Sequence, residues 1–211
     1  MRRVAARFRY ADDRMLRIAT VVDDTRAEGP GRRWALWVQG CSIRCAGCCN
    51  PEMFDDRRGE PVALDALAAR IAHARARGVE GVTFLGGEPF EQAAELAVLA
   101  RHARALAMTV MVFSGYTLDQ LRSRAGAAEL LGLTDLLVDG PYDQTRPEPR
   151  PPVGRRWIGS ANQGMHYLTA AYSPDDPQMR EANTIEIRLA NGSLVINGWP
   201  SADQLVRKPR G

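Results

Sequence analysis

Four cysteines, all that the chain contains, stand in one short segment, residues 40–51, which reads GCSIRCAGCCNP. Three of them, Cys41, Cys45 and Cys48, have the spacing C-x3-C-x2-C, and Cys49 follows directly. Three thiolates this close in sequence can hold one iron–sulfur cluster. A [4Fe–4S] cluster that only transfers electrons usually has four Cys ligands, so three ligands would leave one iron open to a substrate or cofactor.

Three other interpretations of the same spacing stay open. Positions i, i+4 and i+7 share one face of a helix, so the thiols could be core residues, although Gly40, Gly47 and Asn50-Pro51 disfavour a helix. A structural zinc site usually has paired C-x2-C spacings, whereas this segment has one and no nearby His. Disulfides would need a Cys elsewhere in the chain. We therefore favour a cluster with three protein ligands.

Length and composition limit the classes of protein. The 211 residues suit one α/β domain, or one with small additions. Hydrophobic residues make up 45%, charged residues 25%, and the net charge of +3 gives no case for a polyanion-binding surface. No apolar signal core follows Met1-Arg2-Arg3, no run reaches transmembrane length, and no disulfide framework exists. We expect a cytoplasmic protein with no nucleic-acid or membrane partner.

The elements that must position the cysteines alternate between apolar strands and amphipathic helices. Apolar runs predict strands at 34–38, 82–85, 108–113 and 136–138. Apolar spacings predict helices over 64–74 and 96–106, and Thr117 is expected to cap a third helix through Leu121. Such alternation implies a parallel sheet covered by helices, with too few units for an eight-stranded barrel.

We therefore predict an α/β fold with a partial, open parallel β/α barrel over residues 1–170. Residues 143–157, rich in Pro and Arg, are expected to be extended. Residues 171–211 are predicted to form a C-terminal extension with a β-hairpin, in which 184–189 and 194–196 pair around Asn191-Gly192.

Ligands of parallel α/β sheets bind at the carboxyl ends of the strands. Four polar or glycine-rich loops follow predicted strands and would converge there: the cysteine segment, 86–89 (GGEP), 114–116 (SGY) and 139–142 (DGPY).

The cysteine segment followed by Gly86-Gly87-Glu88-Pro89 resembles the radical S-adenosylmethionine (SAM) superfamily. Within it, the chain is similar to the activating proteins of anaerobic ribonucleotide reductase. That narrower resemblance rests on residues 29–32 (GPGR), 39–51, 138–140 (VDG) and 159–163 (GSANQ).

The resemblance implies that Cys41, Cys45 and Cys48 ligate a [4Fe–4S] cluster whose fourth iron binds the amino and carboxylate groups of SAM. An electron from the cluster would cleave the sulfonium C–S bond and give methionine and a 5′-deoxyadenosyl radical. It also implies cofactor-binding roles for Gly86, Gly87 and Glu88 at the methionine end, Ser114 near the ribose or carboxylate, and Asp139 near the carboxylate through a monovalent cation. For Ser114 and Asp139, ordinary turn residues are an open alternative.

Two departures from the family pattern concern Cys49 and the tail. Position 49 often carries an aromatic residue in the family, so Cys49 is either a spare thiol or an alternative ligand. The tail beyond Ala171 extends past the familiar core and is a candidate for partner docking or dimerisation. Trp157 and Trp199 are candidates for an interface.

The implied function is activation of a glycyl radical enzyme, namely the large subunit of anaerobic ribonucleotide reductase or a related protein. A donor such as flavodoxin would supply the electron. A short chain favours this function, because a truncated barrel leaves one side open to an inserted peptide loop. Two alternatives stay open: a small-molecule radical SAM enzyme comparable with the 7-carboxy-7-deazaguanine synthases, and a non-catalytic iron–sulfur or zinc protein that binds a partner.

Overall fold

The computed structural model describes residues 14–190 and 193–198. Its strands are β1 (Met15–Thr25), β2 (Arg33–Val38), β3 (Glu60–Ala63), β4 (Gly81–Gly86), β5 (Thr109–Phe113), β6 (Leu136–Asp139), β7 (Gly164–Tyr167), β8 (Ile185–Ala190) and β9 (Ser193–Gly198). Its helices are α1 (Leu64–Ala76), α2 (Ala93–Ala105), α3 (Leu118–Ser123) and α4 (Ala128–Leu133), with short 3-10 helices η1 (Pro51–Met53), η2 (Pro89–Gln92) and η3 (Pro177–Met179).

A seven-stranded mixed sheet, in the order β3-β1-β2-β4-β5-β6-β7, forms the centre of the fold. Strands β2, β4, β5 and β6 run parallel, as the sequence predicts. The prediction of a parallel sheet is wrong at both edges, where β1, β3 and β7 pair antiparallel with their neighbours. Antiparallel partners need no crossover helix, so the strand–helix alternation carries no sign of them.

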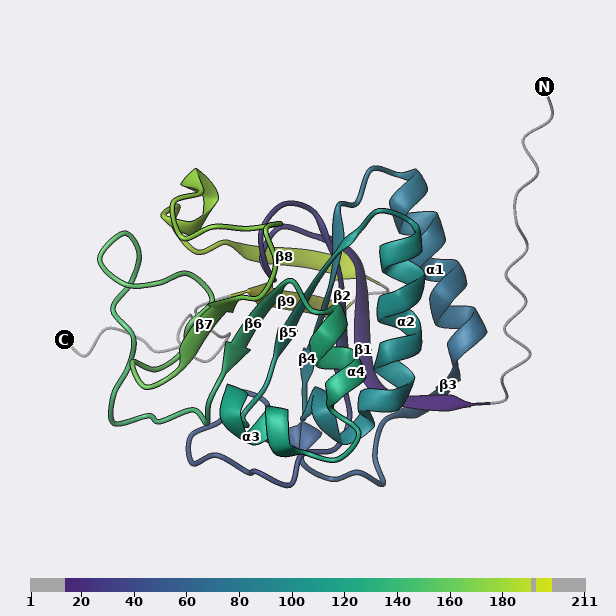
Figure 1. Cartoon of the computed structure of the whole chain (residues 1–211), viewed down its shortest axis with the longest axis horizontal. Coiled ribbons are helices and arrows are strands. Elements are labelled where there is room, and N and C mark those ends of the chain that lie inside the picture. The colour runs from purple at the N-terminus through teal and green to yellow at the C-terminus, as the bar shows by residue number, and fades with distance from the viewer. Residues whose placement is uncertain (1–13, 191–192, 199–211) are drawn as a thin grey trace.

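The two faces of the sheet have different covers. Leu36, Phe84 and Val112 point into the main core together with the apolar faces of α1 and α2, which lie side by side in Figure 1. Their strand neighbours Trp37 and Leu85 point to the other face, where they form a separate cluster. All of β2 is buried, because both faces are covered, and this explains its unbroken apolar run.

Local signals explain where the predicted helices begin and end. Helix α1 ends at Ala76, and Gly78 follows with a φ of 87°, a conformation that favours glycine after a helix. Thr117 caps α3 in a capping box with Gln120, so the predicted cap is confirmed. Helix α4 and strands β3 and β7 were not expected, since each is short and lacks a clear apolar period.

The C-terminal β-hairpin is confirmed as the separate two-stranded sheet β8–β9. The predicted turn at Asn191-Gly192 lies outside the described residues, and so does Trp199. The division into residues 1–170 and 171–211 stays a prediction. Across the described ranges, none of the helices combines the length and the apolar character that crossing a membrane requires.

Candidate functional site

The cysteine loop begins at the end of β2, and residues 52–55 at its other end bond back to Gln39 and Gly40. Gly40 has a φ of 99°, which favours glycine, and its N–H donates to the Met53 carbonyl at 2.9 Å. Gln39 Nε2 donates to the carbonyl oxygens of Glu52 at 3.0 Å and Asp55 at 2.9 Å. These hydrogen bonds hold both ends of the loop at the carboxyl end of the strand.

One cavity, of about 1170 Å³, is lined by all four cysteines. Cys41, Cys45 and Cys48 are partly buried free thiols, and Cys49 is exposed. The end of β4 and the loops that follow β4 and β5 also line this cavity, through Gly86, Gly87, Glu88 and Ser114. The structure therefore brings together the predicted cluster ligands and all the predicted SAM-binding residues except Asp139.

Backbone N–H groups point at the thiols of Cys41 and Cys45, as they do at Cys48. Burial raises the pKa of the Cys41 thiol, and the N–H groups of Arg44 and Ile43 oppose that rise. Burial also raises the pKa of Cys45, against the N–H of Tyr142. N–H groups directed at a thiolate stabilise its charge, and hydrogen bonds to sulfur are among the factors that set cluster potentials.

Cys48 and Cys49 behave as an unequal pair. The Cys49 thiol donates a hydrogen bond that lowers the pKa of Cys48 to about 6, and the same contact raises the pKa of Cys49. The Asn50 N–H also reaches Cys48 Sγ at 3.4 Å. This contact therefore favours the thiolate form at Cys48 and the thiol form at Cys49.

The donor set fits a four-iron cube better than a single ion. In the described part of the chain, no three His, Cys, Asp or Glu side chains come close enough together to hold one metal ion. A zinc site needs its ligands around one centre. A cube takes each thiolate on a different iron, so thiols that face one cavity without meeting at a point suit it.

Gly86 and Gly87 join the end of β4 to the cysteine loop. A Cβ on Gly86 would lie 2.7 Å from Trp37 Cα, and a Cβ on Gly87 would lie 2.1 Å from the Gly40 carbonyl oxygen. The Glu88 N–H donates to that same oxygen at 2.7 Å. Close backbone packing is thus one reason for both glycines, and their contact with SAM stays a prediction.

Glu88 is 1% exposed and occupies the corner between two strand ends. Its Oε1 accepts from the Phe90 N–H at 3.0 Å and the Ser114 hydroxyl at 2.9 Å, and its Oε2 accepts from the Gly115 N–H at 2.8 Å. Burial raises the pKa of Glu88 to about 7, against these three donors. Ser114 therefore acts first as a partner of Glu88, and its contact with SAM stays a prediction.

Asp139 is the one predicted site residue that does not line the cavity. Its Oδ2 accepts from the Leu118 N–H at 2.5 Å, its Oδ1 accepts from the Gly164 N–H at 3.0 Å, and His166 Nε2 lies 3.0 Å from Oδ1. Gly140, the next residue, lines the cavity. The carboxylate thus joins β6 to α3 and β7, and its role toward SAM stays a prediction.

Sequence reasoning missed several residues in the cavity wall, among them Glu28, Trp157 and Asn197. Trp157 is 6% exposed and lines the cavity, and a role for it at an interface stays a prediction. It has a φ of 60°, rare for a bulky residue, and the Arg156 guanidinium stacks 4.2 Å from its ring centre. Only Glu28 had a local signal, since it directly precedes the Gly29-Pro30-Gly31 turn.

Comparison with known proteins agrees with this geometry. Residues 27–166 match the family model of a 4Fe-4S single cluster domain. Anaerobic ribonucleoside-triphosphate reductase-activating proteins are similar to the chain: that of Vibrio cholerae is 33% identical over 147 residues, 67% of this chain and 91% of the relative. That of Salmonella typhi is 31% identical over 147 residues, 66% of this chain and 91% of the relative, and that of phage T4 is 27% identical over 140 residues, 64% and 83%.

The cysteine loop, the sheet that carries it and the family match together define an iron–sulfur protein with a single four-iron cluster. The chain belongs to the family of the anaerobic ribonucleoside-triphosphate reductase-activating proteins. This confirms the predicted class, an enzyme that depends on an iron–sulfur cluster and SAM.

Proposed function

We propose that this chain cleaves SAM reductively and installs a glycyl radical on anaerobic ribonucleoside-triphosphate reductase or a related glycyl radical enzyme. The observation that carries the proposal is one cavity shared by Cys41, Cys45 and Cys48 with Gly87 and Glu88. Membership of the reductase-activating family supports the same function.

The chain's own residues have distinct roles in this proposal. Cys41, Cys45 and Cys48 hold the cluster, and the N–H groups around them stabilise the thiolates. When bound, the cluster and SAM would supply the radical chemistry for hydrogen-atom abstraction from a glycine. Glu88 faces the same cavity as an acceptor for the SAM ammonium group, at a position locked by its three donors.

The finer parts of the proposal concern fold, partner and surroundings. The parallel strands β2, β4, β5 and β6 form the partial barrel of a radical SAM domain, and Asp139 acts on the SAM carboxylate through a monovalent cation. Flavodoxin or a similar low-potential protein supplies the electron, and the chain works in the cytoplasm.

The test is anaerobic reconstitution of the full chain with iron and sulfide, followed by SAM and dithionite. We expect about four irons per chain, release of 5′-deoxyadenosine, and an EPR glycyl doublet when the reductase from the same organism is added. Deoxyadenosine without the doublet would favour a small-molecule substrate. Protein that takes up zinc and no iron would refute the proposal.

A further inference from the structure

The cavity extends from the cysteine loop to the C-terminal hairpin. Its wall also contains Val22 of β1, Glu28 of the turn after β1, and Ile196 and Asn197 of β9. The hairpin lies beyond residue 166, where the match to the family model ends. A segment outside the matched core therefore forms part of the wall of the proposed active site.

Asn197 fastens the hairpin to this wall. It is 8% exposed, and its Nδ2 donates to Thr25 Oγ1 at 2.9 Å and to Glu28 Oε1 at 3.5 Å. Its Oδ1 accepts from Arg188 Nη1 at 3.0 Å. The Gly198 N–H also donates to Glu28. The hairpin thus fixes the position of a carboxylate that lines the cavity.

Two contacts outside the cavity hold the hairpin on the same turn. The Arg26 N–H donates to Glu186 Oε1 at 2.8 Å, and Arg188 Nη2 donates to the Asp24 carbonyl at 2.5 Å. These contacts join strand β8 to the segment 24–28 beside Asn197, which pairs with Glu186 across the hairpin. The hairpin is therefore fixed in place as part of the cavity wall.

The size and chemistry of this end of the cavity suit a peptide. Small-molecule sites have volumes of about 300–1,000 Å³, so a cavity of about 1170 Å³ has room for a second occupant beside SAM. When ionised, Glu28 can only accept hydrogen bonds, and apolar Val22 and Ile196 line the same wall. An extended, glycine-containing peptide offers N–H donors and little side-chain bulk, which matches such a wall.

We infer that the β8–β9 hairpin is a wall of the protein-substrate site, and that Glu28, positioned by Asn197, accepts an N–H group of the glycine-bearing segment of the reductase. The inference rests on the proposed function and adds to it a specificity-determining pair. It places the contact with the protein substrate partly outside the residues that match the family model.

The experiment measures two affinities for reconstituted protein: for SAM by calorimetry, and for immobilised reductase by biolayer interferometry in the presence of SAM. For Asn197→Ala, which releases the Glu28 side chain, and for Glu28→Gln, which replaces one carboxyl oxygen with an NH2 group, the affinity for the reductase should fall about tenfold, as for loss of one hydrogen bond. Leu189→Ser is the matched control, because Leu189 is 79% exposed on the same hairpin, and it should change that affinity less than about twofold.

Glu28→Gln keeps the volume of the side chain, so it tests the contact even if Asn197→Ala detaches the hairpin. Both variants binding the reductase as tightly as Leu189→Ser does would overturn the inference. A fall in SAM affinity as large as the fall in reductase affinity would also overturn it, since the wall would then belong to the cofactor. Wild-type protein that yields no 5′-deoxyadenosine would instead refute the proposed function.

Discussion

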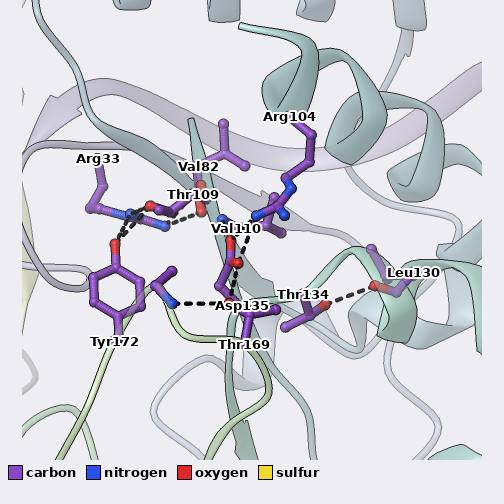
Figure 2. A network of polar contacts seen from close by, with 11 residues as sticks. Arg33, Val82, Arg104, Thr109, Val110, Leu130, Thr134, Asp135, Thr169 and Tyr172 are labelled. Atoms are coloured by element: carbon purple, nitrogen blue, oxygen red, sulfur yellow. Dashed lines mark hydrogen bonds and ion pairs between the residues drawn. The ribbon is translucent and has the colours of Figure 1, made fainter. Parts of the chain in front are cut away.

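Polar side chains are arranged differently at the two ends of the parallel strands β2, β4, β5 and β6. At the carboxyl ends, three partly buried thiols face a cavity, and the buried Glu88 faces it with them. At the amino ends, Arg33 and Asp135 are both 0% exposed and lie inside a closed network of partners, which Figure 2 shows.

The amino-end network joins strands that are distant in sequence. Arg33 donates to Thr83 Oγ1 at 3.0 Å, to Thr109 Oγ1 at 2.6 Å and to the Tyr172 hydroxyl at 3.0 Å, which links β2, β4, β5 and the segment after β7. Figure 2 shows Asp135 on the other side of Thr109.

Asp135 is held just as fully. It accepts from Arg104 Nη1 at 2.6 and 2.8 Å, from the Val110 N–H at 2.8 Å and from the Thr169 hydroxyl at 2.6 Å. Polar groups buried at this end pair with one another and stabilise the sheet. Those at the other end are arranged around a space, which is the pattern of a functional site.

The largest effect should come from removing one thiol at the carboxyl ends. Cys45→Ala should lower the rate of 5′-deoxyadenosine release by at least about a hundredfold, because two thiolates do not hold a [4Fe–4S] cluster in place. The stability of the apoprotein should change by less than about 1 kcal/mol, since Cys45 is only partly buried. Iron content, product release and urea unfolding measure the three quantities. If Cys45→Ala lost as much stability as a substitution in the network around Arg33 and Asp135, the two ends of the strands would not differ in this way.

The opposite result is expected from Asp135→Ala. This change leaves the buried Val110 N–H without its acceptor and breaks the pair with Arg104. We expect a loss of about 3 kcal/mol in the free energy of unfolding, with 5′-deoxyadenosine release per folded molecule unchanged. Asp119→Ala is the control, because its ion pair with Arg122 is exposed and contributes less than about 0.5 kcal/mol. Equal effects of the two substitutions on stability would contradict the comparison.

How far the sequence predicts this fold depends on how local the signal is. The buried strands β2, β4, β5 and β6, the helices α1 and α2 and the Thr117 cap all follow from periods of a few residues. Strand β3 contains Glu60 and Pro61 and shows no apolar pattern, so only its pairing with β1 reveals it.

The functional site also has parts with a local sequence signal and parts that depend on contacts between distant residues. The cysteine loop and Gly86–Glu88 were predictable because their residue types and spacing are contiguous in the sequence. The contact between Thr25 and Asn197 joins residues 172 positions apart, and no local pattern encodes it. The direction of the Asp139 side chain, toward Leu118 and Gly164, depends on how β6, β7 and α3 pack.

A smaller effect is expected from Glu88 at the carboxyl ends of the strands, where it should make the stability of the protein depend on pH. Burial raises the pKa of Glu88 from 4.5 to about 7, so the folded apoprotein binds this proton more tightly than the unfolded chain does. Its contribution to stability is complete below pH 4.5 and is lost as the pH rises to about 7. Between these pH values, the unfolding free energy of wild type should fall by more than that of Glu88→Gln. The difference should be on the order of 2 kcal/mol.

Urea unfolding of wild type and Glu88→Gln across this range measures that difference. Carboxyl groups with a lowered pKa, such as Asp143 with a pKa of about 2, titrate below this pH range. They therefore do not change how the unfolding free energy varies within it. Equal slopes for the two proteins would show that Glu88 is charged in the folded apoprotein at pH 5 to 7.

The smallest effect is expected at Cys49, although it adjoins a predicted ligand. Cys49→Ser should retain the wild-type iron content and release of 5′-deoxyadenosine, because a serine hydroxyl can still donate to the Cys48 sulfur as the Cys49 thiol does. Iron analysis beside Cys45→Ala provides the reference for a lost ligand. If Cys49→Ser lost as much iron as Cys45→Ala, the fourth thiol would be a ligand. The carboxyl ends would then lack the open iron on which their difference from the amino ends depends.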